Sequence, residues 1–168
     1  DTPALPKTAE DSEPPQRIVE AVVKVNDARK RAMGRKVIHA MGGDARGKTV
    51  AVLGLTFKPN TDDMRDSPAI AVVQTLQDAG ATVRAYDPEG VEQAKQVLQN
   101  IDYASDPYAA MTGADALVIV TEWDAFRALD LDRVKSLLKA PVLVDLRNIY
   151  PSAEVTRAGL DYYGVGRS

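Results

Sequence analysis

The sequence contains no cysteine, and its 168 residues include a single histidine, His39. The absence of cysteine excludes disulfides, thiolate zinc sites and a cysteine nucleophile from this chain. One imidazole is too few for a histidine-rich metal cluster, and it leaves His39 as the one candidate base of a histidine-dependent triad. We therefore expect no metal site in this chain.

Long apolar runs and an excess of positive charge are also missing. No apolar run approaches the roughly 20 residues that a membrane-spanning helix needs, and the polar, proline-dotted start does not resemble a signal peptide. Lys and Arg number 21 against 24 Asp and Glu, so the formal net charge is −3, which argues against nonspecific binding of a polyanion. We expect a soluble, cytoplasmic protein with no nucleic-acid or membrane partner. Because the chain begins at Asp1 rather than methionine, we also expect part of a larger protein to be absent.

Changes in composition along the chain predict three segments. Residues 1–14 carry scattered prolines and clustered acids, and predict a lead-in from another domain. Residues 15–43 place apolar side chains at helical spacing on two adjacent stripes and end in a glycine pair, which predicts one long helix over about 15–41. Two stripes require two packing partners, one of which can lie outside this chain. Residues 44–168 are long enough, and apolar enough, to form a domain of their own.

Apolar runs and helical patterns alternate over residues 44–168. Short buried runs predict strands, and Ser67-Pro68 followed by Gly80 predicts a helix with both ends capped. The predicted strands are 48–55, 82–86, 101–104, 115–121, 142–145 and 160–165, and the predicted helices are 67–79, 91–98, 107–111, 131–138 and 152–158. This alternation predicts an α/β fold, namely a Rossmann-like, doubly wound and mainly parallel six-stranded sheet preceded by the long helix.

Ligands of such sheets bind beyond the carboxyl ends of the strands, and the first of these junctions, at residues 54–68, is the most informative. A dinucleotide-binding loop would carry G-x-G-x-x-G here, whereas this loop has Gly54 alone. Phe57 offers an apolar plate, and Lys58 and Arg65 are two cations near a helix N-terminus that could compensate a phosphate or a carboxylate. The alternative is that both cations pair with the aspartates of the same loop, Asp62, Asp63 and Asp66.

The later junctions contribute further polar groups. Asp87 ends the second strand, where it can hold a dinucleotide ribose or cap the following turn, and without the glycine pattern we favour the cap. Trp123 is expected to pack against its loop rather than to stack on a ligand. Arg147 can bind a phosphate or a carboxylate with its guanidinium fork, or it can pair with Asp145 or another local acid. If the interpretation is right, Lys58 and Arg147 lie on the same side of the sheet and face a common cavity.

Several blocks of the sequence resemble one known family, in the family's order. They are IVEAVVKVNDARKRAM at 18–33, VAVLGLTFKPNTDDMRDSPA at 50–69, AYDP at 85–88, VIVTEWDAF at 118–126 and VLVDLRNIY at 142–150. The chain thereby resembles the central helix and carboxyl-terminal domain of the UDP-glucose 6-dehydrogenases, within the wider UDP-glucose/GDP-mannose dehydrogenase family. The likeness covers essentially the whole chain, and F-K-x-x-T-D-D-x-R is its most specific motif.

The resemblance implies an enzyme that is only partly present here. In this family an amino-terminal domain binds NAD, a carboxyl-terminal domain binds the nucleotide of the substrate, and the long helix between them also builds a homodimer. The family oxidises UDP-glucose twice at C6 with two NAD, through a cysteine thiohemiacetal and thioester, to UDP-glucuronate. The catalytic cysteine and the NAD-binding glycine motif are not in this chain. We therefore expect a half that binds UDP-glucose, dimerises through the 15–41 helix and does not oxidise substrate alone, with NAD held mainly by the absent domain.

The resemblance also implies roles for individual residues. Phe57 and Lys58 match the family pair that contacts the substrate, and Arg147 matches a later substrate-contacting arginine. Arg65 matches the arginine that reaches NAD. The opening DTPAL resembles the segment after the lysine of the family's C-F-x-K-D motif, so Asp1 would be the carboxylate that assists a catalytic water.

Two alternatives stay open at this point. One is a GDP-mannose or UDP-N-acetyl sugar dehydrogenase domain, since only the Glu122-Trp123 block leans toward UDP-glucose. The other is a non-catalytic α/β interaction module that dimerises through the long helix. Such a module would have no reason to place an aromatic residue and two cations in the 57–65 loop.

Overall fold

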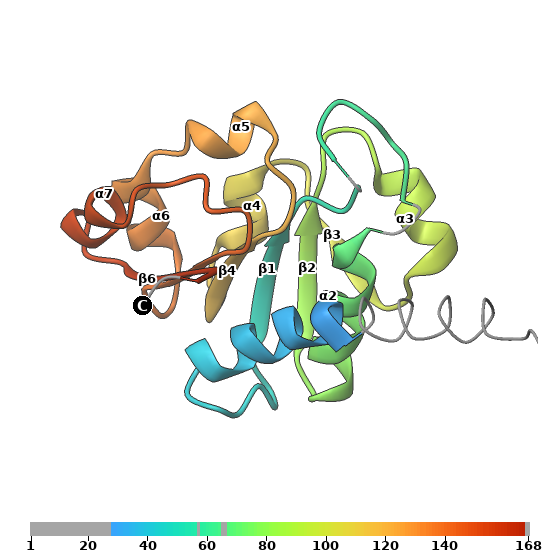
Figure 1. The fold of residues 1–168 in the computed structure, drawn as a ribbon, viewed down its shortest axis with the longest axis horizontal. Coiled ribbons are helices and arrows are strands. Elements are labelled where there is room, and N and C mark those ends of the chain that lie inside the picture. Colours follow the sequence, from blue (N-terminus) through green and yellow to red (C-terminus); the bar gives the residue numbers. More distant parts are fainter. Residues whose placement is uncertain (1–27, 57, 65–66, 167–168) are drawn as a thin grey trace, which may run out of the picture.

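The computed structural model describes residues 28–56, 58–64 and 67–166. Its centre is a six-stranded sheet in which all strands are parallel, in the order β3-β2-β1-β4-β5-β6 (Figure 1). The strands are β1 (Thr49–Leu53), β2 (Thr82–Tyr86), β3 (Ile101–Tyr103), β4 (Ala116–Ile119), β5 (Val142–Asp145) and β6 (Asp161–Gly164). The chain changes direction across the sheet between β1 and β4, which makes this pair the switch point of a doubly wound fold.

Helices pack on both faces of the sheet. A helix over residues 28–40 precedes β1, and the later helices are α2 (Pro68–Asp78), α3 (Val91–Val97), α4 (Pro107–Met111), α5 (Asp124–Arg127), α6 (Leu131–Leu137) and α7 (Ser152–Arg157). One buried apolar cluster joins the sheet to α2, α3 and the helix over 28–40, and a second joins the opposite face to α4, α5, α6 and α7. Along β1, Val50 and Val52 belong to the first cluster and Ala51 and Leu53 to the second. The strand is therefore buried on both faces, as a continuous apolar run in a parallel sheet predicts.

The ends of α2 follow directly from its sequence. The Ser67 hydroxyl accepts a hydrogen bond from the Ala69 amide at 3.1 Å, and Pro68 occupies the first helical position, where its missing N–H is not needed. Gly80 follows the helix with φ +91°, a conformation that favours glycine. Ser67 and Pro68 therefore fix where the first strand-to-helix loop ends and α2 begins, and Gly80 fixes where α2 ends.

The helix over residues 28–40 is the described part of the helix predicted at 15–41, whose residues 15–27 lie outside the described range. Val37, Ala40 and Met41 are buried in the first core cluster, whereas His39 is exposed. The Lys48 ammonium donates a hydrogen bond to the Met41 carbonyl at 2.8 Å, just past the helix end. Cations at a helix C-terminus compensate its unpaired carbonyls, so this contact stabilises the point where the helix turns into β1.

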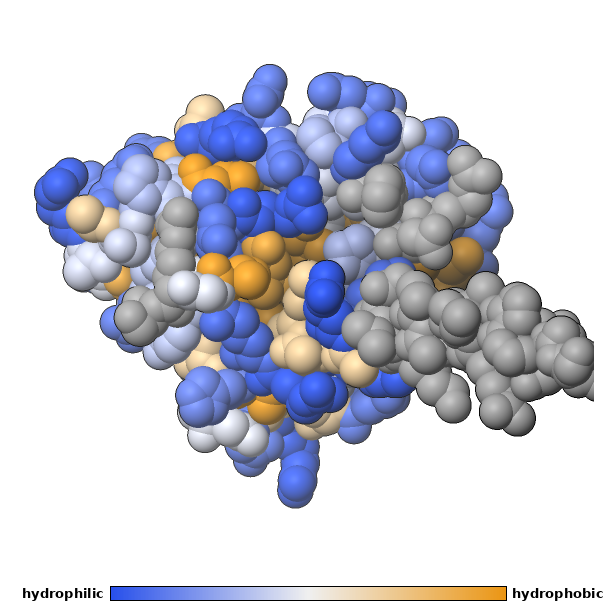
Figure 2. All heavy atoms as spheres, viewed as in Figure 1, coloured by the Kyte–Doolittle hydropathy of each residue, from blue (hydrophilic) through white to orange (hydrophobic). Residues whose placement is uncertain are grey.

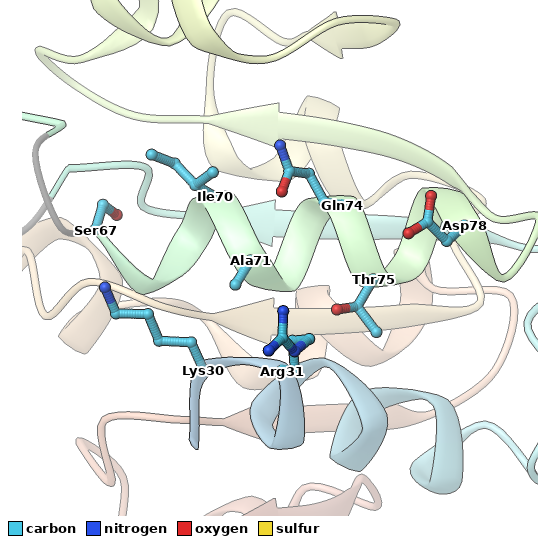
Figure 3. A pocket seen from close by; sticks show the side chains of 8 residues that line it. All are labelled: Lys30, Arg31, Ser67, Ile70, Ala71, Gln74, Thr75 and Asp78. Carbon is cyan, nitrogen blue, oxygen red and sulfur yellow. The ribbon is translucent and has the colours of Figure 1, made fainter. Parts of the chain in front are cut away.

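Gly34 lets this helix approach α2 closely. A Cβ atom built on Gly34 would lie 2.6 Å from the Cβ of Thr75. Figure 3 shows the two helices side by side, with a hollow of about 390 Å³ between them. Its lining comes from both helices and the Ser67 cap: Lys30, Arg31, Ser67, Ile70, Ala71, Gln74, Thr75 and Asp78.

The sequence-based prediction of a Rossmann-like α/β fold is confirmed, and the sheet is parallel throughout rather than mainly parallel. The strand at 82–86, the helix at 107–111 and the strand at 142–145 have the predicted bounds, and the other predicted elements of residues 44–168 end one or two residues earlier. The short helix α5 was not predicted, because four residues carry no helical periodicity. None of the helices in the described ranges has both the length and the apolar character needed to span a membrane.

We expect Gly34→Ala to lower the free energy of unfolding by about 1–3 kcal/mol, because the added methyl group meets Thr75 and forces two packed helices apart. Urea denaturation measures this change. Glycine to alanine in an unobstructed helix stabilises by roughly 0.4–1 kcal/mol, so a gain in stability would contradict the close approach. Ala32→Gly, at an exposed position of the same helix, is the control and should cost about 1 kcal/mol through helix propensity alone.

Candidate functional site

The carboxyl ends of β1, β2, β4 and β5 lie along one edge of the sheet, at the top of Figure 1. Each strand is followed there by a loop that carries candidate polar residues. The β1–α2 loop holds Lys58, the turn after β2 holds Asp87, the β4–α5 loop holds Glu122, and the loop after β5 holds Arg147. In a doubly wound sheet this edge is where ligands bind.

The Asp87 carboxylate joins two of these loops. It is buried, with 3% of its surface exposed. One oxygen accepts hydrogen bonds from the amides of Leu55 at 2.7 Å and Thr56 at 3.3 Å, and the other accepts from the amides of Glu89 at 2.8 Å and Gly90 at 2.7 Å. Asp87 thus caps the turn after β2, as we favoured from the sequence, and it also fixes the first residues after β1. A buried carboxylate is stable only when its oxygens are satisfied in this way.

These contacts explain why the first junction cannot act as a dinucleotide cradle. In a G-x-G-x-x-G loop, free backbone amides after the first strand face the pyrophosphate. Here the amides of Leu55 and Thr56 already donate to Asp87, and both side chains are fully buried. Gly54 has φ +98°, and a Cβ atom on it would lie 2.5 Å from the Cβ of Thr121. This glycine therefore serves the close packing of β1 against β4 and not the approach of a phosphate.

Buried threonines connect the Lys58 loop to the end of β4. The Thr56 hydroxyl donates to the carbonyl of Lys58 at 2.9 Å, and the Thr121 hydroxyl donates to the carbonyl of Thr56 at 2.9 Å. Thr121 directly precedes Glu122, whose carboxylate pairs with Arg147 at 2.8 Å. This chain of contacts places Lys58 and Arg147 along the same edge of the sheet. The Lys58 side chain is exposed, and within the described part of the chain no carboxylate forms an ion pair with it.

The backbone around Arg147 is held from two sides. The buried carboxylate of Asp145 accepts from the amide of Arg147 at 3.2 Å and from the amide of Tyr150 at 2.9 Å. The side-chain amide of Asn148 donates to the Val165 carbonyl at 2.8 Å, and its oxygen accepts from the Val165 amide at 2.9 Å. Asn148 has φ +52°, a left-handed conformation that asparagine tolerates better than most residues. The loop therefore presents Arg147 from a fixed backbone.

Tyr150 ends this loop and ties it to α5. Its buried hydroxyl donates to the Phe126 carbonyl at 2.5 Å and accepts from the Leu129 amide at 3.1 Å. Burial raises the pKa of Tyr150 to about 12, the Leu129 amide partly offsets this rise, and the negative charges of Glu154 and Asp145 add to it. The phenol is thus neutral under ordinary conditions and acts as a structural tie.

The structure accounts for some predicted site residues and not for others. The Arg147 side chain pairs with Glu122 and not with Asp145, so the acid beside it is the other local acid that the sequence left unnamed. Trp123 packs in the second core cluster with 8% of its surface exposed, in agreement with the packing role. Phe57, Arg65 and Asp1 lie outside the described residues, so their roles stay predictions.

Neither of two hollows in the structure is lined by the candidate cations Lys58 and Arg147. The hollow of Figure 3 lies between two helices, and its lining includes neither Lys58 nor Arg147. A second, of about 640 Å³, lies beside the β1–α2 loop and is lined by Thr61, Asp62, Asp63, Met64, Ile70, Gln93, Gln96 and Val97. Its charged lining is acidic, which disfavours a phosphate. Figure 2 shows apolar residues gathered near the centre of the visible face and hydrophilic ones around them. The common cavity expected for Lys58 and Arg147 is neither of these hollows, since neither lining includes Lys58 or Arg147.

Comparison with known proteins agrees with these observations. Residues 51–152 match the family model of the UDP binding domain of the UDP-glucose/GDP-mannose dehydrogenase family. The chain is 66% identical over 167 residues to a UDP-glucose 6-dehydrogenase of Rhizobium meliloti (strain 1021), a match that covers 99% of this chain and 38% of that protein. It is 40% identical to the UDP-glucose 6-dehydrogenase TuaD of Bacillus subtilis (strain 168), with 99% and 36% covered. The chain therefore spans a little over a third of the length of these relatives.

Two solved structures similar to this chain are also nucleotide-sugar dehydrogenases. A UDP-glucose dehydrogenase from Pyrobaculum islandicum superposes with a TM-score of 0.72 at 32% identity, over 90% of this chain and 33% of that one. An NDP-N-acetyl-D-galactosaminuronic acid dehydrogenase from Methanosarcina mazei Go1 superposes with a TM-score of 0.78 at 28% identity, over 100% of this chain and 34% of that one.

We expect Asp87→Asn to lower the free energy of unfolding by about 2–4 kcal/mol, because an amide NH₂ would replace one oxygen and face two backbone N–H donors. Chemical denaturation measures the loss. Asp106→Asn is the matched control, since Asp106 caps α4 through the Ala109 amide and asparagine caps helices equally well. Equal stability of the two variants would contradict the role given to Asp87.

The raised pKa of Tyr150 predicts a loss of stability in alkali. The unfolded chain releases this proton near pH 10 and the folded chain near pH 12, so the contribution is complete below pH 10 and disappears as the pH rises to about 12. The full contribution is about 2–3 kcal/mol. We expect the unfolding free energy of Tyr150→Phe to fall less steeply than that of the wild type over this interval. Parallel alkaline profiles of the two proteins would contradict the assignment.

Proposed function

Since the chain belongs to the UDP-glucose/GDP-mannose dehydrogenase family, we propose that it is the nucleotide-binding part of an NAD-dependent UDP-glucose 6-dehydrogenase. In this proposal the full-length protein oxidises UDP-glucose to UDP-glucuronate with two NAD, and residues 44–168 hold the UDP group. The UDP-glucose 6-dehydrogenases of Rhizobium meliloti and Bacillus subtilis, at 66% and 40% identity, favour UDP-glucose over GDP-mannose and the UDP-N-acetyl sugars. They also leave the alternative of a non-catalytic interaction module without support.

The observation that carries the proposal is the position of Lys58 and Arg147 on one edge of the sheet, connected through Thr56, Thr121 and Glu122. The diphosphate of a UDP-sugar carries two negative charges. An arginine fork can bind two of its oxygens at once, and a lysine ammonium supplies a point charge on a flexible stem. The two cations together fit a diphosphate better than either fits alone.

The described residues do not fit NAD. The amides of Leu55 and Thr56 donate to Asp87, which leaves no free cradle for a second pyrophosphate. We therefore assign NAD binding to the part of the full-length protein beyond this domain, with Arg65 as the one cofactor contact proposed within the chain. NAD would supply the hydride acceptor, and the residues of this domain would bind and orient the substrate.

The contribution of this domain to catalysis is binding energy. Contacts to the nucleotide lie far from the reacting C6 atom, yet they restrict the substrate to one position and one orientation. Phe57, Lys58 and Arg147 are the proposed substrate contacts, and Asp1 is proposed to assist the catalytic water. The helix over 15–41 is proposed to build a homodimer of the full-length protein.

We expect the chain to bind UDP weakly, with Kd of order millimolar, because the remaining walls of the pocket belong to the rest of the protein. Loss of a charge-assisted contact weakens binding by about tenfold or more, so Lys58→Ala should do so in isothermal titration calorimetry. Lys139→Ala is the control, because Lys139 is exposed at the opposite edge of the sheet, before β5. No heat with millimolar UDP, or equal affinity of all three proteins, would refute the proposal.

A further inference from the structure

The ion pair between Arg147 and Glu122 differs from the others in the described part of the chain. Its Nη2–Oε1 distance of 2.8 Å is the shortest there, and it connects the ends of two strands, β4 and β5. The pairs Lys95–Glu92 and Arg127–Asp124 each lie within one helix at 3.3 and 4.0 Å, and Arg84–Asp102 joins the neighbouring strands β2 and β3 at 3.5 Å. The Arg147 and Glu122 side chains are 37% and 28% exposed, so the pair is open to solvent on one side.

The backbone of Glu122 is as firmly placed as that of Arg147. Its neighbours Thr121 and Trp123 are 1% and 8% exposed. The Thr121 hydroxyl donates to the Thr56 carbonyl, and the Trp123 carbonyl accepts from the Phe126 amide in the first turn of α5. The carboxylate therefore extends from a fixed backbone toward a guanidinium that also extends from a fixed backbone.

The two acids near Arg147 have different tasks. Asp145 is fully buried, and its oxygens accept from the Arg147 and Tyr150 amides and from the Tyr162 hydroxyl. Asp145 thus binds the main chain of the loop, and the guanidinium of Arg147 pairs with Glu122 instead. A partly exposed ion pair contributes little to folding stability, so stability alone does not account for this arrangement. Orientation does, because an arginine held in one rotamer loses less conformational entropy when it binds an anion.

We infer that Glu122 is a positioning residue, which holds the Arg147 guanidinium in the orientation that binds the diphosphate of a nucleotide sugar. The inference rests on the proposed function, because it assumes that Arg147 contacts the nucleotide. A guanidinium has five N–H donors, and the contact with Glu122 engages Nη2. The remaining donors stay available for phosphate oxygens on the open side of the pair.

The test is a double-mutant cycle on UDP affinity with the variants Glu122→Ala, Arg147→Ala and the double variant. Glu122→Ala should weaken binding about tenfold, and it should have no further effect in the Arg147→Ala background. Glu122→Gln keeps an oxygen acceptor for the N–H of Arg147 and should restore most of the affinity. Asp124→Ala is the control. It removes the same negative charge two positions after Glu122, from an exposed side chain that pairs with Arg127, and it should leave the affinity for UDP unchanged.

A second measurement separates positioning from folding. The order parameter of the Arg147 side-chain N–H groups, measured by nitrogen relaxation, should fall in Glu122→Ala while the urea midpoint of unfolding stays close to that of the wild type. Unchanged or tighter UDP binding by Glu122→Ala would overturn the inference, as would an equal loss in the Arg147→Ala background. If Arg147→Ala weakens binding and Glu122→Ala does not, only this inference fails. If the wild type does not bind UDP, both proposals fail.

Discussion

The carboxylate of Asp87 is the contact on which the arrangement of the ligand-binding edge depends. It satisfies amides from the β1–α2 loop with one oxygen and amides from the turn before α3 with the other. An aspartate at this place in a dinucleotide enzyme faces a ribose and leaves the preceding loop to the cofactor. Here the acid serves the protein itself. The backbone donors of Leu55 and Thr56 are thereby used inside the protein, so the proposed binding of a nucleotide sugar depends on side chains.

Side-chain recognition requires that the side chains start from fixed positions. Threonines at the ends of β1 and β4 connect the lysine-bearing loop to the centre of the sheet. Asp145, Asn148 and Tyr150 hold the arginine-bearing loop against β6 and α5. Some of these contacts are local, such as that of Asp145 with the Arg147 amide, and others join distant parts of the chain, such as that of Thr121 with the Thr56 carbonyl. They convert a glycine-poor edge, which has no backbone cradle, into a surface where two cations can act together on one anion.

The sequence predicted the fold well because its signals are local. Ser67-Pro68 and Gly80 delimit α2, and the apolar run 115–121 contains the fully buried strand β4. The candidate cations were also accessible, through residue type and resemblance. The residues that pair with them in the fold could not be predicted from the sequence. Nothing local connects Glu122 to Arg147 or Asn148 to Val165, and Asp87 reads as an ordinary cap until the fold brings Leu55 and Thr56 to it. Pairings over tens of residues depend on strand order, and α5 is too short to show a period.

The contact between Gly34 and Thr75 has a mechanical consequence. Because Gly34 has no side chain, its backbone packs directly against the side chain of Thr75, and no larger residue fits at position 34 without displacing that side chain. The helix over residues 28–40 is thus packed tightly on α2, whose N-cap is Ser67, where the lysine-bearing loop ends. A change in the packing at Gly34 would therefore be felt in α2, and through Ser67 at the end of the loop that carries Lys58.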